Sequence, residues 1–420
     1  MQNDSSARSL VRRGCPLCTS REAHQVLDLP PTPLGDRFLR NRIKALELPL
    51  YPLNVLRCTT CQHIYLPFVT SPEESYSEYL FTSAISPGLV AAFSEIAADM
   101  CQRHRIGKGD LVLDIGANDG SWLSCFESSS SRVLAVEPAP GPAALASERG
   151  IPVISEYFRK DAIFQSKLLT QPPRIVSLNY VFANVPNPLD VLSDVAAICD
   201  ENSIISILTG YHPAQLSVSM FDYIYHEHLS YFTLLDFQLI AEQLGLVVTF
   251  CRELPLKGGS IHIELKKKTP GQEQSAMFSM LLKREGWLDQ PKDTKWLTVQ
   301  QNLKGTKDKI RQFVDSKKCE QAVILGYGAS HSTTTLSYTL GIEDDMHGVI
   351  DDNPSKQDTY APGSGVRVGS LGNLCSTDNV VSIIVLAWQH GPAIIERLRQ
   401  IGFRGSVAVP FPTFQIQTLM

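Results

Sequence analysis

The chain has 420 residues, which exceeds the size at which one hydrophobic core keeps growing, so we expect two or three domains. Hydrophobic residues make up 43% of the sequence and charged residues 19%, as in ordinary globular proteins. The formal net charge of −5 argues against a dedicated nucleic-acid surface, which is normally basic. An anionic substrate must therefore be held by local groups.

Targeting and cysteine usage point to the cell interior. No apolar run follows the arginines near the N-terminus, and no stretch approaches the roughly 18 apolar residues of a membrane span. We therefore expect a cytoplasmic monomer that contacts neither membrane nor nucleic acid. Of the ten cysteines, two tight pairs have the spacing of metal ligands, and we expect the others to be small buried apolar residues.

Two CxxC pairs lie near the N-terminus, Cys15-Pro-Leu-Cys18 and Cys58-Thr-Thr-Cys61. Each pair can grip one edge of a tetrahedral zinc ion with two thiolates. Four protein ligands leave no open coordination position, so the zinc would be structural rather than catalytic. Unrelated buried cysteines are the alternative.

Strand and helix patterns alternate from Ile106 onward, as in a parallel sheet covered by helices. A polar, amphipathic helical stretch between Pro270 and Lys318 interrupts the alternation, which then restarts. We expect an α/β protein with a small zinc-binding module over residues 1–73. Two Rossmann-like, doubly wound α/β domains would follow over residues 74–255 and 256–420.

A glycine-containing turn, DIGANDG over residues 114–120, follows the first strand of this alternation, and Glu137 ends the next strand. A carboxylate there can accept hydrogen bonds from both ribose hydroxyls of an adenosyl ligand. Asn118 stands where a pyrophosphate-binding turn needs glycine, so the turn favours S-adenosylmethionine over NAD. A tight connection without a ligand is the alternative. The expected cofactor contacts are Asp114, Gly116, Asn118, Asp119, Gly120, Glu137 and Asn179.

Two histidines, a glutamate and several tyrosines crowd into FDYIYHEHLSYF, residues 221–232. Titratable groups this close shift one another's pKa, which favours an acid–base site over an ordinary core. A histidine with a near-neutral pKa can remove a proton from carbon beside a ketone, and nearby Tyr and Glu can stabilise the enolate. A metal site on the HxH pair His226 and His228 is the alternative.

A second turn, GYGAS over residues 326–330, opens a helix in the C-terminal half. His331 replaces the third glycine of a dinucleotide turn, so a nicotinamide cofactor is disfavoured. The backbone N–H groups and the threonines at 333–335 suit a diphosphate at a helix N-terminus. A loop with a lysine and a tyrosine follows, which is either part of that site or an ordinary solvated loop. The expected substrate contacts are His226, Lys257, Tyr327, His331, Lys356 and Tyr360.

The order CxxC, CxxC, DIGANDG, YHEHLSYF, KGGS, GYGAS, DNPSKQ resembles the sugar C-methyltransferase family, which makes 3-C-methyl deoxysugars. The likeness spans nearly the whole chain. It implies a zinc-binding N-terminal domain, a central domain for the methyl donor and a C-terminal domain that helps to hold a nucleotide sugar.

By the same resemblance, His228 is the base that removes the C3 proton of a 4-keto sugar, with Glu227 and Tyr225 beside it. Tyr79 resembles the family's active-site tyrosine. The identity of the sugar and its nucleotide stays open because the chain departs from the family pattern at Phe81, Asn184, His262, Ser332 and Asp358.

The sequence therefore predicts an S-adenosylmethionine-dependent C-methyltransferase that acts at C3 of a nucleotide-activated 4-keto-deoxysugar through an enolate. One alternative is an NAD-dependent nucleotide-sugar oxidoreductase that uses the GYGAS turn. Another is a methyltransferase of the same fold with a different keto substrate. A zinc protein that binds nucleic acid is disfavoured by the negative net charge.

Overall fold

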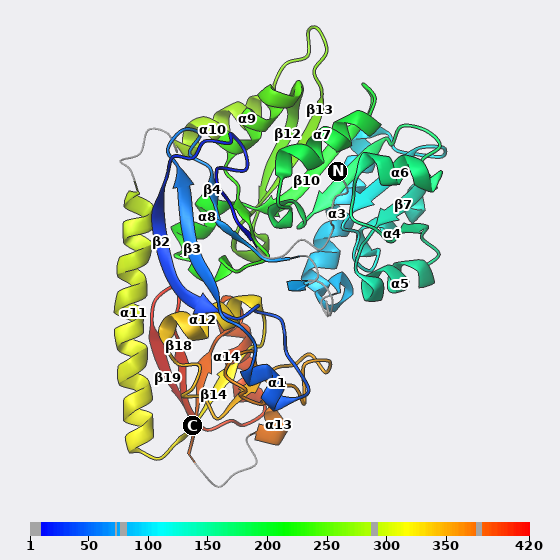
Figure 1. The fold of residues 1–420 in the computed structure, drawn as a ribbon. Coiled ribbons are helices and arrows are strands. Elements are labelled where there is room, and N and C mark those ends of the chain that lie inside the picture. Colours follow the sequence, from blue (N-terminus) through cyan, green and yellow to red (C-terminus); the bar gives the residue numbers. More distant parts are fainter. Residues whose placement is uncertain (1–9, 72–73, 76–81, 287–292, 375–379) are drawn as a thin grey trace.

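The computed structural model describes residues 10–71, 74–75, 82–286, 293–374 and 380–420, so Tyr79 and Phe81 lie outside the described residues. An N-terminal module, a central α/β unit and a C-terminal α/β unit follow one another along the chain (Figure 1). Within the described ranges, no helix combines the length and the apolar composition needed to cross a bilayer.

The central unit contains a seven-stranded sheet of order β12-β13-β10-β9-β6-β7-β8. Its strands are β6 (Leu111–Ile115), β7 (Arg132–Val136), β8 (Val153–Ile154), β9 (Ile175–Asn179), β10 (Ile204–Gly210), β12 (Leu246–Leu254) and β13 (Ser260–Lys267). The run from β8 to β10 is parallel, whereas β13 is antiparallel to both of its neighbours. Every residue of β6 is buried, as expected for a parallel strand covered on both faces.

Helices cover both faces of the central sheet. They are α3 (Pro87–His104), α4 (Ser121–Ser124), α5 (Pro140–Glu148), α6 (Lys160–Ser166), α7 (Pro188–Ile198), α8 (His212–Ser217), α9 (Leu234–Leu244) and α10 (Ala276–Glu285). Apolar residues of α3 and α4 pack with Val112 on one face, and those of α7, α9 and α10 pack with Leu111 and Leu113 on the other. This alternation along β6 is the two-residue period of a strand.

The strand pairing corrects the predicted domain boundary at residue 255. That residue lies between β12 and β13, which pair with each other as neighbours in the central sheet. The central unit therefore continues at least to Lys267, and α10 packs onto it. The glycine-rich KGGS segment belongs to the hairpin turn that returns the chain to the same sheet.

The N-terminal module is built on a four-stranded sheet of order β11-β4-β3-β2. Its elements are β1 (Leu10–Val11), β2 (Ala23–Thr32), α1 (Arg42–Leu46), β3 (Tyr51–Cys58), β4 (Ile64–Tyr65), β5 (Phe68–Val69) and β11 (Ser230–Tyr231). The last strand comes from the central unit, and β1 pairs separately with β5. The module thus completes its sheet with a strand borrowed from another part of the chain.

The C-terminal unit has a six-stranded sheet of order β16-β15-β14-β17-β18-β19, parallel except for β19. Its elements are β14 (Val323–Tyr327), α12 (His331–Leu340), β15 (Gly348–Ile350), β16 (Val368–Gly369), α13 (Leu371–Leu374), β17 (Val381–Val385), α14 (Gly391–Gln400), β18 (Gly405–Val409) and β19 (Gln415–Leu419). The long helix α11 (Thr294–Cys319) precedes it and buries an apolar stripe that includes Trp296 and Phe313. The polar stretch between the two α/β units is therefore two helices, α10 and α11.

All three parts of the chain meet at the first turn of α12, which lies at one end of the β2–β3 ribbon (Figure 1). The Thr334 hydroxyl donates to the Gly35 carbonyl of the N-terminal module at 2.8 Å. The Thr335 hydroxyl donates to the Ile224 carbonyl of the central unit at 3.0 Å. Each bond is buried, so its loss leaves a carbonyl without a donor in a place that water does not reach.

We expect Thr335→Val to lower the free energy of unfolding by about 1–2 kcal/mol, because the near-isosteric change removes only the buried donor. Thr298→Val is the matched control, since that hydroxyl is exposed and bonds within α11. Differential scanning calorimetry of both variants measures the effect. Equal unfolding midpoints for the two variants would contradict the role of this bond between units.

Candidate active site

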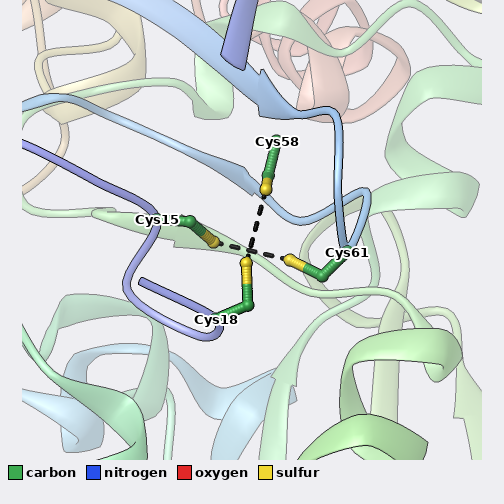
Figure 2. A group of neighbouring side chains, drawn as sticks. All are labelled: Cys15, Cys18, Cys58 and Cys61. Carbon is green, nitrogen blue, oxygen red and sulfur yellow. Dashed lines mark hydrogen bonds between the residues drawn. The ribbon is translucent and has the colours of Figure 1, made fainter. Parts of the chain in front are cut away.

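The two CxxC pairs converge in the N-terminal module (Figure 2). The four sulfur atoms of Cys15, Cys18, Cys58 and Cys61 lie within 4.8 Å of one another, and the closest pairs are 3.5 Å apart. A disulfide needs an S–S distance of about 2.05 Å. Four thiolates bound to one tetrahedral zinc at about 2.3 Å lie about 3.8 Å apart. The arrangement therefore fits a zinc ion and does not fit a disulfide.

The strand that follows the second CxxC pair is joined directly to the loop of residues 221–232, here called the acid–base loop. The Leu66 N–H donates to the Leu229 carbonyl at 3.0 Å. The His63 ring is fully buried and contacts Ser230 Oγ at 3.2 Å and Asp236 at 3.0 Å. The metal-binding turn thus positions the residues immediately after His228.

The turn of residues 114–120, which follows β6, depends on two glycines. Gly116 has a φ of 70° and Gly120 a φ of 76°, which side chains rarely adopt. A Cβ on Gly116 would also lie 2.7 Å from Val181 Cγ2, so the turn has no room for one. These constraints bring the backbone of the turn close to the end of the sheet.

Two buried carboxylates flank this turn. Glu137 accepts hydrogen bonds from the Asn118 and Ala139 N–H groups, both at 2.8 Å. Asp114 accepts from Ser177 Oγ at 2.6 Å and from Asn179 Nδ2 at 3.2 Å. Burial raises the pKa of Glu137 and raises that of Asp114 to about 7. A ligand with hydroxyl or ammonium donors would favour the ionised forms of both groups.

A cavity of about 500 Å³ opens above the turn and extends to the acid–base loop. This volume is typical of small-molecule sites. Five of the expected cofactor residues line the cavity: Asp114, Gly116, Asn118, Glu137 and Asn179. Asp119 and Gly120 are not in its lining. The Asp119 carboxylate instead accepts from Ser121 and from the Ala84 N–H, and so stabilises the turn itself.

The acid–base loop contributes the side chains at the other end of the cavity, where His228, Glu227 and Tyr225 all line the wall. His228 Nδ1 lies 2.9 Å from the Tyr223 carbonyl, and Nε2 lies 2.8 Å from the Tyr225 hydroxyl. Because a carbonyl only accepts, the proton of the neutral ring is on Nδ1, and Nε2 accepts from the phenol. Burial lowers the pKa of His228 to about 3, so the ring is neutral over the physiological range.

Three expected substrate residues also line the cavity: His226, Lys257 and His331. His226 Nε2 donates to the carbonyls of Tyr51 and Pro52 at 3.3 and 3.2 Å. The Lys257 ammonium lies 3.8 Å from the centroid of the Tyr180 ring, and burial lowers its pKa to about 8. Within the described residues, the group of His, Cys, Asp and Glu side chains close enough to hold a metal is the four-cysteine cluster, not the HxH pair.

The other three expected substrate residues do not line this cavity. The Tyr327 hydroxyl donates to Asp352, and the Tyr360 backbone pairs with Leu39. Lys356 donates to Asp36 Oδ1 at 2.6 Å and to the Ala329 carbonyl at 2.7 Å. The predicted contacts at these three positions are not brought into the site, and the polar groups of Tyr327 and Lys356 already have protein partners.

At the start of α12, protein groups likewise occupy the threonine hydroxyls that were predicted to cradle a diphosphate. Thr333, Thr334 and Thr335 donate their hydroxyls to protein carbonyls. Gly35 also covers the helix N-terminus so closely that a Cβ there would lie 2.7 Å from His331 Cα. Sequence patterns identify a helix N-terminus, but they do not reveal which distant segment covers it.

Several lining residues were not predicted, among them Tyr180, Thr209, Gln215 and Tyr223. Tyr180 and Thr209 occupy the ends of neighbouring parallel strands, and that position was an available signal. Tyr223 acts through its backbone carbonyl, for which no sequence signal exists.

The departures from the family pattern fall both inside and outside the cavity. Asn184 lines it, whereas His262, Ser332 and Asp358 do not. His262 is buried in β13 with Nε2 2.9 Å from Ser206 Oγ, and Asp358 forms an exposed ion pair with Arg367. Among the described departures, Asn184 is therefore the one placed to affect the bound molecule directly.

Three family models match successive parts of the chain: "Putative zinc binding domain" over residues 15–76, "Methyltransferase domain" over 90–249 and "C-methyltransferase C-terminal domain" over 255–412. Among curated proteins, C-methyltransferase NovU of Streptomyces niveus is 25% identical over 404 residues, which cover 95% of this chain and 96% of that protein. The three models follow the order of the three parts of the structure.

Two solved structures resemble part of the chain. Mitomycin 7-O-methyltransferase MmcR is 17% identical with a TM-score of 0.35, over 44% of this chain and 56% of its own. Magnesium protoporphyrin IX methyltransferase from Synechocystis PCC 6803, with bound S-adenosylmethionine, is 12% identical with a TM-score of 0.34, over 46% of this chain and 88% of its own. Each likeness covers less than half of this chain.

We expect about one tightly held zinc ion per chain, because the two CxxC pairs complete a tetrahedron. Cys58→Ser should lose the zinc and destabilise the N-terminal module before it affects methyl chemistry. The exposed Cys319 supplies the control Cys319→Ser, which should keep the metal. Elemental analysis of protein purified without chelator decides the matter, and absence of zinc from the unmodified protein would exclude the site.

For the cofactor we expect Glu137→Ala to weaken S-adenosylmethionine binding by about 1–3 kcal/mol, the scale of losing charged hydrogen bonds to two ribose hydroxyls. Glu127→Ala, an exposed position in the same unit, is the control. Isothermal titration calorimetry measures both. Unchanged affinity in the Glu137 variant would place the cofactor elsewhere.

Proposed function

We propose that this chain, which is an S-adenosylmethionine-dependent C-methyltransferase with a zinc-binding N-terminal domain, methylates C3 of a nucleotide-activated 4-keto-deoxysugar through an enolate. The proposal is carried by one observation. His228 presents an unprotonated Nε2, already in contact with the Tyr225 hydroxyl, to the cavity that also contains the cofactor turn.

The tautomer of His228 supports its assignment as the base. Its Nδ1–H is held by the Tyr223 carbonyl, so Nε2 carries no proton and can take one from the substrate when the Tyr225 phenol turns from it to the keto oxygen. The low pKa differs from the near-neutral value that the sequence suggested, because burial disfavours the imidazolium. An enolate forming beside the ring would stabilise the imidazolium and raise its pKa during the reaction.

The distance between His228 Nε2 and the Tyr225 hydroxyl is close to the distance between the two substrate atoms that react. In a 4-keto sugar, C3 and the keto oxygen are two bonds apart, about 2.4 Å. His228 Nε2 and the Tyr225 hydroxyl are 2.8 Å apart. Nε2 can therefore take the C3 proton while the phenol donates to the oxygen on which the negative charge develops.

S-adenosylmethionine, when bound, supplies the electrophilic methyl group. Asp114 and Glu137 line the same cavity as the acid–base loop. These residues would hold the donor facing the carbon that His228 deprotonates, as attack in line with the breaking bond requires.

Unpaired acceptors in the cavity wall favour a substrate rich in hydroxyl groups. Glu227 Oε2, Asn184 Oδ1 and His226 Nδ1 are buried and have no donor among the described residues. Thr209 Oγ1 is likewise without a partner there. Sugar hydroxyls are donors as well as acceptors, so a deoxysugar would satisfy groups that otherwise cost about 1–3 kcal/mol each when buried alone.

An oxidoreductase that binds NAD at the GYGAS turn is disfavoured because the N-terminus of α12 is covered. A Cβ on Gly35 would lie 2.7 Å from His331 Cα, where a diphosphate would have to approach the helix. Asp351, the acid that would receive a ribose, accepts the Ala329 N–H at 2.7 Å and the Asn353 N–H at 2.8 Å.

We expect His228→Asn to bind both ligands nearly normally and to lose methyl transfer by roughly 100-fold or more, the usual worth of a general base. It should also lose exchange of the C3 proton with deuterated solvent, which the unmodified enzyme should catalyse with S-adenosylhomocysteine bound. NMR of the sugar signal measures this exchange apart from methyl transfer.

His390→Asn is the control, because that side chain is exposed in the C-terminal unit and does not line the cavity. Retained exchange in the His228 variant would reassign the base, with Tyr225, His226 and Tyr79 as the remaining candidates. Methylation of a different keto substrate, with none on the 4-keto sugar, would refute the substrate class.

A further inference from the structure

His331, the first residue of α12, reaches the acid–base loop from a different part of the chain. Its ring stacks on the Tyr225 ring with centroids 4.9 Å apart and an interplanar angle of 30°. Its Nε2 lies 3.5 Å from Glu227 Oε1. A single side chain of the C-terminal unit thus contacts two of the residues assigned to the reaction.

A row of ionisable side chains leads to Glu227. Lys356 donates to Asp36 Oδ1 at 2.6 Å, and the same oxygen lies 3.8 Å from His331 Nδ1. The Glu227 side chain is 5% exposed, and its Oε2 has no donor among the described residues. His331 therefore connects the neutralised Asp36–Lys356 pair to a buried carboxyl of the cavity.

Tyr225 depends on its ring neighbours for its orientation. The His228 ring lies 4.0 Å from it, and the phenol hydroxyl bonds to His228 Nε2. Because the hydroxyl is at the end of the ring, a small rotation of the side chain moves it by a large fraction of a hydrogen-bond length. The His331 ring restricts that rotation from outside the loop.

We propose that His331 is a positioning residue for methyl transfer. Its ring fixes the Tyr225 phenol against His228, and its Nε2 holds the Glu227 carboxyl toward the cavity. The inference rests on the proposed function of the loop. It differs from the sequence-based expectation that His331 simply contacts the substrate.

A substitution at Gly35 of the N-terminal module can alter the support of His331 without changing the His331 side chain. A Cβ on Gly35 would meet His331 Cα at 2.7 Å and the His331 carbonyl oxygen at 2.9 Å. Both atoms belong to the backbone, which cannot rotate away, so α12 and the segment that carries Gly35 must move apart. Gly35→Ala therefore changes the contact that supports His331 while leaving every side chain of the site intact.

The test compares His331→Ala, His331→Phe and Gly35→Ala, with His390→Ala as the exposed control. We expect His331→Ala to lower kcat roughly 10- to 100-fold with KM nearly unchanged, the signature of lost positioning. His331→Phe keeps the stacked ring and should recover part of the loss. Gly35→Ala should lower kcat in the same way, with the unfolding midpoint of each variant recorded to identify a folding defect.

A spectroscopic measurement decides the inference independently of substrate. In the ¹⁵N-histidine-labelled full chain, the His228 Nε2 signal should shift in His331→Ala and return toward the unmodified value in His331→Phe. An unmoved His228 signal would overturn the inference, and so would a raised KM with unchanged kcat. An unmodified enzyme that is inactive on 4-keto sugars would refute the proposed function instead, while the His228 signal would still decide the role of His331.

Discussion

Two short strands hold the metal-binding turn and the acid–base loop together, and the geometry of the site follows from their pairing. Ser230 and Tyr231 of β11 pair with β4, and the Leu66 N–H extends the contact to Leu229. Because His228 directly precedes this pairing, its backbone position is set by the N-terminal module. The structural zinc therefore influences the position of His228 without contacting a substrate. The influence passes through the backbone hydrogen bonds between β4 and β11, whose register the metal-bound cysteines help to fix.

A second junction fixes the part of the cavity wall that lies beside the acid–base loop. The hydroxyls of Thr334 and Thr335 bond the first turn of α12 to the N-terminal module and to the central unit. His331 projects from the same turn into the cavity wall. The reacting groups thus come from a loop that is bonded on one side to the N-terminal module and on the other to α12. Such support from two sides holds a proton acceptor in a fixed geometry relative to an electrophile. Burial has a cost as well, because it keeps His228 a weak base until charge develops beside it.

Sequence motifs predicted the features that depend only on residues close together in the chain. The cysteine pairs, the turn at 114–120 and the acid–base loop were found by spacing, since each is a short continuous motif. The contacts of Lys356 were not, because its partner Asp36 is distant in sequence and belongs to another part of the chain. The pairing of β13 with β10 and β12, which carries the central sheet past residue 255, was not predicted either, because no local pattern specifies which strands pair. Long-range pairing is the information that one sequence does not display.

The borrowed strand also bears on how the chain folds as it is made. Synthesis delivers all four cysteines once residue 61 has emerged, so metal capture can begin early. The sheet of the N-terminal module stays open much longer, because β4 ends at Tyr65 and its partner β11 begins only at Ser230. Until then β4 has an unpaired edge of the kind that joins other strands indiscriminately. The first part of the chain to bind its metal therefore completes its sheet only after strands β6 to β10 of the central unit have been made.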